Sequence, residues 1–296
     1  MLNLLNFKRN NHTDLSFFGS IFHFNKSGLI NGIGDSSAPI FLRSLAKPIQ
    51  ASLLLDFADN FNEEEIAVFC SSHTAQDYHL KTIRGVLERF GLSENNLKCG
   101  IHPPFAPRND SENTQIHNNC SGKHTLMLAL CILNNWNIEN YLSPEHPLQK
   151  RILQRHIELS GCGNLIPSLD GCGAPIYALS PENIARAFFN LDKKITNSMR
   201  NHPKLAGGDG RVDTKIMECS TQLVSKLGAG GLLLVLNGDE CLIIKLAQDN
   251  NHEREVVAST ALNQLKWINK PLCDYDGGNL HDDKVGEYRA NFNLVN

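Results

Sequence analysis

Residues 118–136 read NNCSGKHTLMLALCILNNW, and they place a thiol, a hydroxyl, an amine and an imidazole directly before a long apolar run. The apolar run predicts a helix that is buried on most of its sides. Cys120 and Lys123 are three positions apart, so both lie on one face where this helix begins. The stretch therefore predicts a core helix that carries reactive side chains at its start.

The composition of the chain is that of a globular protein. It has 296 residues, of which 41% are hydrophobic and 20% charged, enough for one large domain or two modest ones. The formal net charge of −3 argues against nucleic-acid binding, and no apolar run is long enough to span a membrane. The N-terminus lacks the order of a secretory signal, so we expect a cytoplasmic protein. The nine cysteines are then expected to be mostly free thiols.

The elements around the core helix predict an α/β fold with α+β layers. Residues 20–34 predict two short strands, residues 41–61 a helix, residues 63–73 a strand, and residues 76–92 another helix. Helices at 147–161 and 180–195 precede two strands joined by a turn at 237–239 and a last helix at 254–268. Strands thus lie at both ends of the chain and helices in the middle. This order predicts one sheet shared by the two ends.

We divide the chain into three parts on the same patterns. Residues 1–17 are expected to form a variable N-terminal segment. Residues 18–270 are expected to form a single domain with a helical region at roughly 75–200. Residues 271–296 are expected to form a polar tail that is loosely held.

Ser44 and Lys47, in the segment RSLAK, share one face of a helix if one begins there. Pro48 favours a helix that begins close to Ser44, because proline is tolerated only in the first turn. A desolvated Lys47 amine could then act as the base for a Ser44 nucleophile, with backbone N–H groups nearby for an oxyanion. The alternative is an ordinary serine cap beside a solvated lysine, since this short pattern is common.

Two other polar segments could have either a functional or a purely structural role. Ser71, Ser72 and His73 follow an apolar segment, where a turn often presents functional side chains. Lys226 ends a strand-like segment before GAGG, and the glycine-rich segment AGGDGRVDTKIM, residues 206–217, lies upstream. Either segment could face a substrate or simply connect two elements.

The opening stretch superficially resembles a phosphate-binding loop, but the match fails at both ends. His117 stands where the first glycine is required, and His124 stands where Ser or Thr should follow the lysine. Farther along, Cys172 lies in the glycine-flanked turn DGCG, after Asp170. Two thiolates suit a borderline ion such as zinc, whereas two buried free cysteines are the simpler alternative.

Taken in order, these segments resemble one known family. FLRSLAKPIQA, EEEIAVFCSSH, NNCSGKHTLML, DGCGAPIYAL, AGGDGRVDTKIM and VSKLGAGG resemble the zinc-binding L-asparaginases with a serine-β-lactamase-like fold. The resemblance covers about residues 18–268, and the pair NCSGKH and DGCG is its specific part. CSGKHTL and SKLGAGGLLLVL also look like segments of serine-dependent glutaminases.

The resemblance implies a serine-β-lactamase/penicillin-binding-protein-like fold, in which an antiparallel sheet is flanked by helices and joined to a helical region. It implies hydrolysis of L-asparagine to L-aspartate and ammonia by a zinc-containing homodimer. The implied site residues are the catalytic Ser44, Lys47, Ser72 and Lys226, the substrate-binding Arg43, His124 and Asp170, and the zinc ligands Cys120, Lys123 and Cys172.

The sequence also departs from the family pattern. Gly230 stands where the family usually has a glutamate, and the turn after His73 reads TAQ without the usual acidic residue. Two alternatives to asparagine hydrolysis therefore remain open. One is a glutaminase or another serine amidohydrolase of the same fold, and the other is a degenerate member that binds an amino acid or zinc without turnover.

Overall fold

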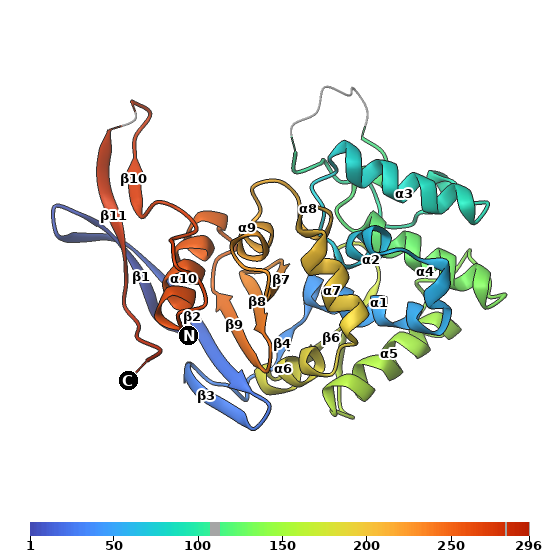
Figure 1. The fold of residues 1–296 in the computed structure, drawn as a ribbon, viewed down its shortest axis with the longest axis horizontal. Coiled ribbons are helices and arrows are strands. Elements are labelled where there is room, and N and C mark those ends of the chain that lie inside the picture. The colour runs from blue at the N-terminus through green and yellow to red at the C-terminus, as the bar shows by residue number, and fades with distance from the viewer. Residues whose placement is uncertain (107–112, 282, 296) are drawn as a thin grey trace.

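The computed structural model describes residues 1–106, 113–281 and 283–295. An extended sheet forms one end of the molecule and a group of helices the other, as Figure 1 shows. The many Pro, Asn and His residues at 99–118 predict a long loop, and part of this segment lies outside the described residues. No helix in the described ranges is both long enough and apolar enough to cross a membrane.

The main sheet is built from both ends of the chain. It has eight strands in the order β10-β11-β1-β2-β9-β8-β7, with β3 paired to β2 off this path. Every pairing in this sheet is antiparallel, and β2 pairs with β9 from Gly19–Leu246 to Asn25–Glu240. The strands are β1 (Leu2–Arg9), β2 (His12–Asn25), β3 (Gly28–Ile33), β7 (Leu223–Gly228), β8 (Leu232–Asn237), β9 (Glu240–Leu246), β10 (Asp276–Gly278) and β11 (Lys284–Ala290). The predicted shared sheet is confirmed.

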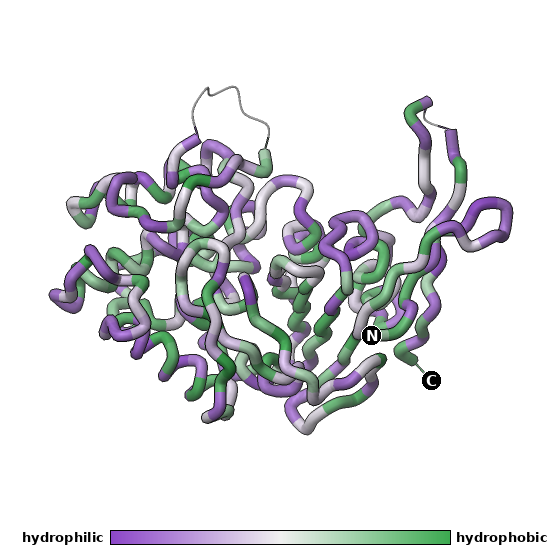
Figure 2. The backbone as a smooth tube through the Cα atoms, turned by 180° about the vertical axis from the view of Figure 1, so that it is seen from behind, coloured by the Kyte–Doolittle hydropathy of each residue, from purple (hydrophilic) through white to green (hydrophobic). Residues whose placement is uncertain are grey.

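Alternate side chains of a strand point to opposite faces of the sheet. Both faces of the central strands are buried. Leu232, Leu234 and Leu236 of β8 belong to one hydrophobic core, whereas Leu233 and Val235 belong to a second. The second core also contains side chains of α9 (Val212–Cys219) and α10 (Asn251–Gln264). Figure 2 shows these central strands as mainly hydrophobic. Helices therefore cover both faces, and the predicted α/β layers with an antiparallel sheet are confirmed.

The helical region packs against the first core. It contains α1 (Ala46–Ala51), α2 (Glu63–Cys70), α3 (Asp77–Arg89), α4 (Ser121–Leu133), α5 (Pro147–Ser160), α6 (Pro181–Phe189), α7 (Lys193–Asn201) and α8 (Pro203–Ala206). A small three-stranded sheet joins β4 (Ile40–Phe41), β6 (Pro175–Leu179) and β5 (Ile166–Leu169) in that order. Eleven of the thirteen residues of α4, from Ser121 to Cys131, are buried, which confirms the predicted core helix.

Two predictions about local structure were wrong. Residues 63–70 form helix α2 and not a strand, because Asn62 and Glu65 make a capping box at its N-terminus. The residues after Cys273 are also not a loose tail. Strand β10 pairs with β11, and β11 pairs with β1 from Leu5–Ala290 to Lys8–Glu287. The predicted division at residues 17/18 and 270/271 stays a prediction, although strands outside those limits belong to the same sheet.

Gly122 allows α4 to approach α2 closely. A Cβ atom at residue 122 would lie 2.5 Å from the Val68 carbonyl oxygen and 2.9 Å from a Val68 methyl carbon. We expect Gly122→Ala to force the two helices apart and to lower the free energy of unfolding by about 1–3 kcal/mol. Denaturant titration measures this change.

Gly85 provides the matched control, because it lies inside α3 and a Cβ atom there would meet nothing within 4 Å. Gly85→Ala is expected to raise the free energy of unfolding by about 0.5–1 kcal/mol. If the two substitutions changed the free energy of unfolding equally, the contact between α2 and α4 would not be the reason for glycine at residue 122.

Candidate active site

Ser44 lies at the start of a helical run, as its neighbour Pro48 predicted. Strand β4 leads into a 3₁₀ turn, η1 (Arg43–Leu45), which continues directly into α1. Arg43 has a φ of +47°, a left-handed conformation that is uncommon for a residue other than glycine. Strained backbone of this kind gathers at functional sites. Ser44 itself is only 6% exposed.

The Lys47 amine is fully buried among oxygen acceptors. Its Nζ donates to the Ser71 carbonyl at 2.6 Å, to the Ser72 hydroxyl at 3.0 Å and to the Asn119 carbonyl at 3.1 Å. Burial lowers the pKa of Lys47, and the nearby Lys123 adds to this effect, whereas Cys120 and Cys172 oppose it. No hydrogen bond joins Lys47 to Ser44 among the described residues. Such contacts often tighten only when a substrate binds.

A second buried lysine lies on the other side of Ser72. Lys226 Nζ, from β7, is 3.5 Å from the Ser72 hydroxyl oxygen and 3.7 Å from a carboxylate oxygen of Asp213. Burial lowers the pKa of Lys226 to about 8, although Asp213 opposes this shift. The Ser72 hydroxyl is therefore placed between two amines whose protons are held less firmly than those of exposed lysines.

The predicted metal ligands lie together in a neighbouring cluster. Cys120, at the start of α4, and Cys172, in the turn before β6, meet Asp170 so that one donor atom from each lies within 4.8 Å of the others. Lys123 Nζ lies 3.6 Å from an Asp170 carboxylate oxygen, and Arg43 donates to the other oxygen at 2.8 Å. The structure thus brings Cys120, Lys123 and Cys172 together and adds Asp170 as a fourth donor.

The charges of this cluster are strongly coupled. A hydrogen bond from Cys120 lowers the pKa of Cys172 to about 5, and the same bond together with burial raises the pKa of Cys120 to about 12. Burial opposes the charge on Lys123, but the two sulfur groups and Asp170 outweigh it and raise its pKa. These shifts favour a thiolate at Cys172 beside a protonated Lys123.

The donor set fits a borderline divalent ion. Two sulfur atoms and a carboxylate are common zinc ligands, whereas an ammonium group must lose its proton before it can bind a metal. Asp170 therefore competes with Lys123 for the position of third ligand. The family resemblance implies that Asp170 binds substrate, and the structure shows its two oxygens shared between Arg43 and Lys123.

The two clusters are joined through the backbone beside Cys120. Lys47 donates to the carbonyl of Asn119, the residue immediately before Cys120.

His124 is fully buried on α4, where its Nδ1 is 2.8 Å from the Tyr141 hydroxyl and its Nε2 has no hydrogen-bond partner among the described residues. Burial lowers the pKa of His124 to about 3, so the ring is neutral. Neither His124 nor Ser44 makes a hydrogen bond to another predicted site residue.

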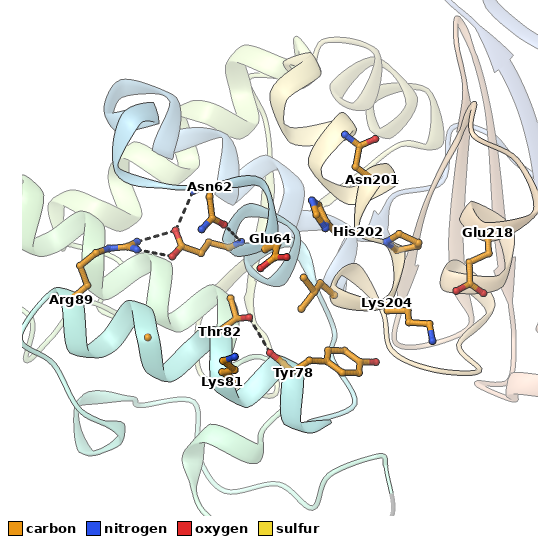
Figure 3. Close-up of a pocket in the computed structure, with 14 residues that line it drawn as sticks. Asn62, Glu64, Tyr78, Lys81, Thr82, Arg89, Asn201, His202, Lys204 and Glu218 are labelled. Carbon is orange, nitrogen blue, oxygen red and sulfur yellow. Dashed lines mark hydrogen bonds and ion pairs between the residues drawn. The ribbon is translucent and has the colours of Figure 1, made fainter.

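Two cavities lie on this part of the molecule. One of about 370 Å³ is lined by Arg43, Ala229 and Gly230, beside the segment that follows Lys226. A larger cavity of about 680 Å³ lies near α2, α3 and α8, where Tyr78, Arg89 and His202 are among its lining residues (Figure 3). None of the predicted site residues lines the larger cavity. Of the predicted site residues, Arg43 alone lines the cavity of about 370 Å³, and Ser44 is not part of its lining.

Sequence analysis missed two buried residues that support the site. Asp213 accepts a hydrogen bond from the Leu227 N–H at 3.1 Å and lies beside Lys226, although it is distant in sequence. Tyr141 contacts His124 from the segment between α4 and α5. Asp213 lies in the predicted glycine-rich segment, but nothing in that pattern distinguishes it from Asp209. Tyr141 has no sequence signal.

Comparison with known protein families places the chain in one of them. The family model described as L-asparaginase II matches residues 5–289, almost the whole chain. The chain belongs to the L-asparaginase II family, a family of asparaginase-type amidohydrolases. The curated proteins include no match.

Among solved structures, a β-lactamase from Mycobacterium bovis is 13% identical to this chain. The similarity covers 83% of this chain and 94% of the β-lactamase, with a TM-score of 0.43. A TM-score this low supports no conclusion about activity.

Proposed function

We propose that the protein hydrolyses L-asparagine to L-aspartate and ammonia, with Ser44 as the nucleophile. Membership of the L-asparaginase II family supports the class of reaction. The observation that supports the mechanism best is the buried chain Lys47–Ser72–Lys226, which begins one helical turn after Ser44. Two amines with lowered pKa values can accept and return protons more readily than ordinary lysines do.

The reaction would proceed through an ester of Ser44. Lys47 takes the hydroxyl proton as Ser44 Oγ attacks the carbonyl carbon of the side-chain amide. The C–N bond then breaks, and a proton passed through Ser72 from the lysines lets ammonia leave. Water then attacks the ester and gives a proton to Lys47, and Lys47 passes this proton to Ser44 Oγ as the ester bond breaks and aspartate leaves. Arg43 and Asp170, which carry opposite charges, are suited to hold the charged groups on the α-carbon of asparagine.

The neighbouring cluster is proposed to hold zinc through Cys120, Cys172 and either Lys123 or Asp170. A bound zinc ion would supply positive charge that positions a substrate group and fixes the pocket. The ion is not required as a source of hydroxide, because the serine supplies the nucleophile. A homodimer and a cytoplasmic location remain predictions from the family resemblance and the N-terminal sequence.

A panel of substrates tests the proposed function. Ammonia release should be faster from L-asparagine than from L-glutamine, and a chromogenic β-lactam should not be consumed. Preference for glutamine would favour the glutaminase alternative. Stoichiometric binding of asparagine without product would instead show a degenerate member that no longer catalyses the reaction.

Cys172→Ser tests the metal centre, with Cys219→Ser as the matched control, because Cys219 is exposed and outside the cluster. Zinc content after purification without chelator should fall by about one ion per chain in Cys172→Ser, because a hydroxyl binds zinc far more weakly than a thiolate does. The control should keep the wild-type content. An unchanged zinc content in Cys172→Ser would rule out this cluster as the binding site.

A further inference from the structure

A second group of metal-binding side chains lies beside α10. One donor atom each from His252, Glu255 and Cys273 lies within 4.8 Å of the others. His252 and Glu255 are three positions apart near the start of α10 and share one face of the helix. Cys273 comes from the segment between α10 and β10 and packs against the second core. Cys120 and Cys172, by contrast, belong to the first core. The group is therefore separate from the candidate active site.

The donor atoms of this group are largely uncommitted. In the described part of the chain, the His252 ring makes no hydrogen bond and only contacts the edge of the Tyr288 ring, with centroids 4.9 Å apart. Cys273 is a free thiol without a hydrogen bond. Glu255 forms an ion pair with Lys215, and Oε1 is the oxygen nearer to the lysine.

The segment that carries Cys273 is held in place by bonds on both sides of the cysteine. The Leu272 N–H donates to the Ser259 hydroxyl of α10 at 3.0 Å, and the Tyr275 hydroxyl donates to the same oxygen at 3.0 Å. Thr260 adds a hydrogen bond to the Tyr275 hydroxyl at 3.2 Å. Because these bonds already fix the segment against α10, little ordering would be needed to bring the thiol onto an ion.

We propose that His252, Glu255 and Cys273 bind a borderline divalent cation of the zinc class, with water as the fourth ligand. Imidazole, carboxylate and thiolate together suit such an ion, whereas magnesium and calcium prefer oxygen ligands alone. The full negative charges of the thiolate and carboxylate outweigh the partial positive charge at the start of α10. Lys215 orients Glu255 from the side of Oε1, as a neighbour of a metal ligand commonly does.

A bound ion would connect the C-terminal segment to α10. Cys273 leads into β10 and β11, and β11 pairs with β1 at the outer part of the main sheet. Binding to the folded state alone stabilises that state. The site is therefore a structural one, and its loss should loosen the C-terminal strands without requiring any change at Ser44 or Lys47.

Titration with Co²⁺ tests the site, because cobalt bound to thiolate gives a near-ultraviolet absorption band. The chain with Cys120→Ser and Cys172→Ser should still bind one equivalent of Co²⁺ and show the thiolate band. Adding Cys273→Ser should remove both the band and the equivalent, whereas adding Cys219→Ser should change neither. Absence of binding in the double variant, or binding that survives Cys273→Ser, would overturn the proposal.

His252→Ala in the otherwise natural chain gives a second readout, which holds even if the double variant does not fold. Total Co²⁺ binding should fall by one equivalent relative to the natural chain. Added Zn²⁺ should slow proteolysis of residues 272–290 in the natural chain but not in His252→Ala. Equal binding and equal zinc protection in the two proteins would also overturn the proposal.

Discussion

Ser44→Ala is expected to lower the rate of ammonia release from L-asparagine by at least about a thousandfold, because no other group then forms the ester. The Ser44 hydroxyl makes no hydrogen bond among the described residues, so Ser44→Ala removes the nucleophile without breaking a hydrogen bond. We therefore expect unchanged circular dichroism and a melting temperature within a few degrees of the natural protein. Steady-state kinetics and thermal unfolding measure the two effects separately.

Ser52→Ala is the matched control for this substitution. Ser52 is also buried on the same helical run, but its hydroxyl donates to the Ile49 carbonyl at 2.7 Å. It should lose about 1 kcal/mol of stability and keep its activity. If Ser44→Ala retained ammonia release at the natural rate, Ser44 would not be the nucleophile.

Lys47→Met is expected to have the second largest effect on activity, a loss of about a hundredfold to ten-thousandfold, which is the usual range for a general base. Methionine fills a similar volume but cannot take a proton from Ser44. The substitution leaves the Ser71 and Asn119 carbonyls without the Lys47 donor, which lowers stability. Removal of a buried amine raises stability, so the two effects oppose each other. Stability should therefore change much less than kcat/KM. Lys150→Met on the surface of α5 is the control, and it should change neither quantity.

The pH dependence of the natural enzyme follows from the lowered pKa of Lys47. A base is active when it has lost its proton, so kcat/KM should rise with pH through this pKa, below the ordinary lysine value of 10.5. The same shift affects stability. The unfolded chain binds the Lys47 proton more readily than the folded chain does, so protonation of Lys47 at low pH lowers the free energy of unfolding. This loss of stability disappears as the pH rises from the lowered pKa toward 10.5. A rate that falls with rising pH across that range would contradict a basic role for Lys47.

The order of elements could be predicted largely from the sequence, because strong patterns act locally. The apolar run of α4 and the turn between β8 and β9 are of this kind. Residues 63–70 misled the prediction because a short apolar run fits a buried strand as well as a helix, and the deciding cap involves Asn62 and Glu65. The pairing of β11 with β1 joins distant segments, and β11 has few large apolar side chains, so the sequence held no local signal for it.

The candidate site was predictable residue by residue but not as a network. The motifs indicated Lys47, Ser72 and Lys226 as candidate residues. The structure shows that the Ser72 hydroxyl lies between the Lys47 and Lys226 amines. Sequence spacing could not show that Asp170 joins the two cysteines, nor that Asp213 pairs with Lys226. These contacts depend on how separate elements pack, and no periodicity in the sequence encodes them.

The central claim is that Ser44 attacks the side-chain carbonyl of asparagine, and covalent labelling tests it most directly. An asparagine analogue with a diazomethyl ketone in place of the amide should alkylate the attacking group. Peptide mapping by mass spectrometry should then find one label per chain, on Ser44, and excess L-aspartate should slow the labelling. A label on Ser72, Cys120 or Cys172 with Ser44 unmodified, or no label at all, would contradict the account.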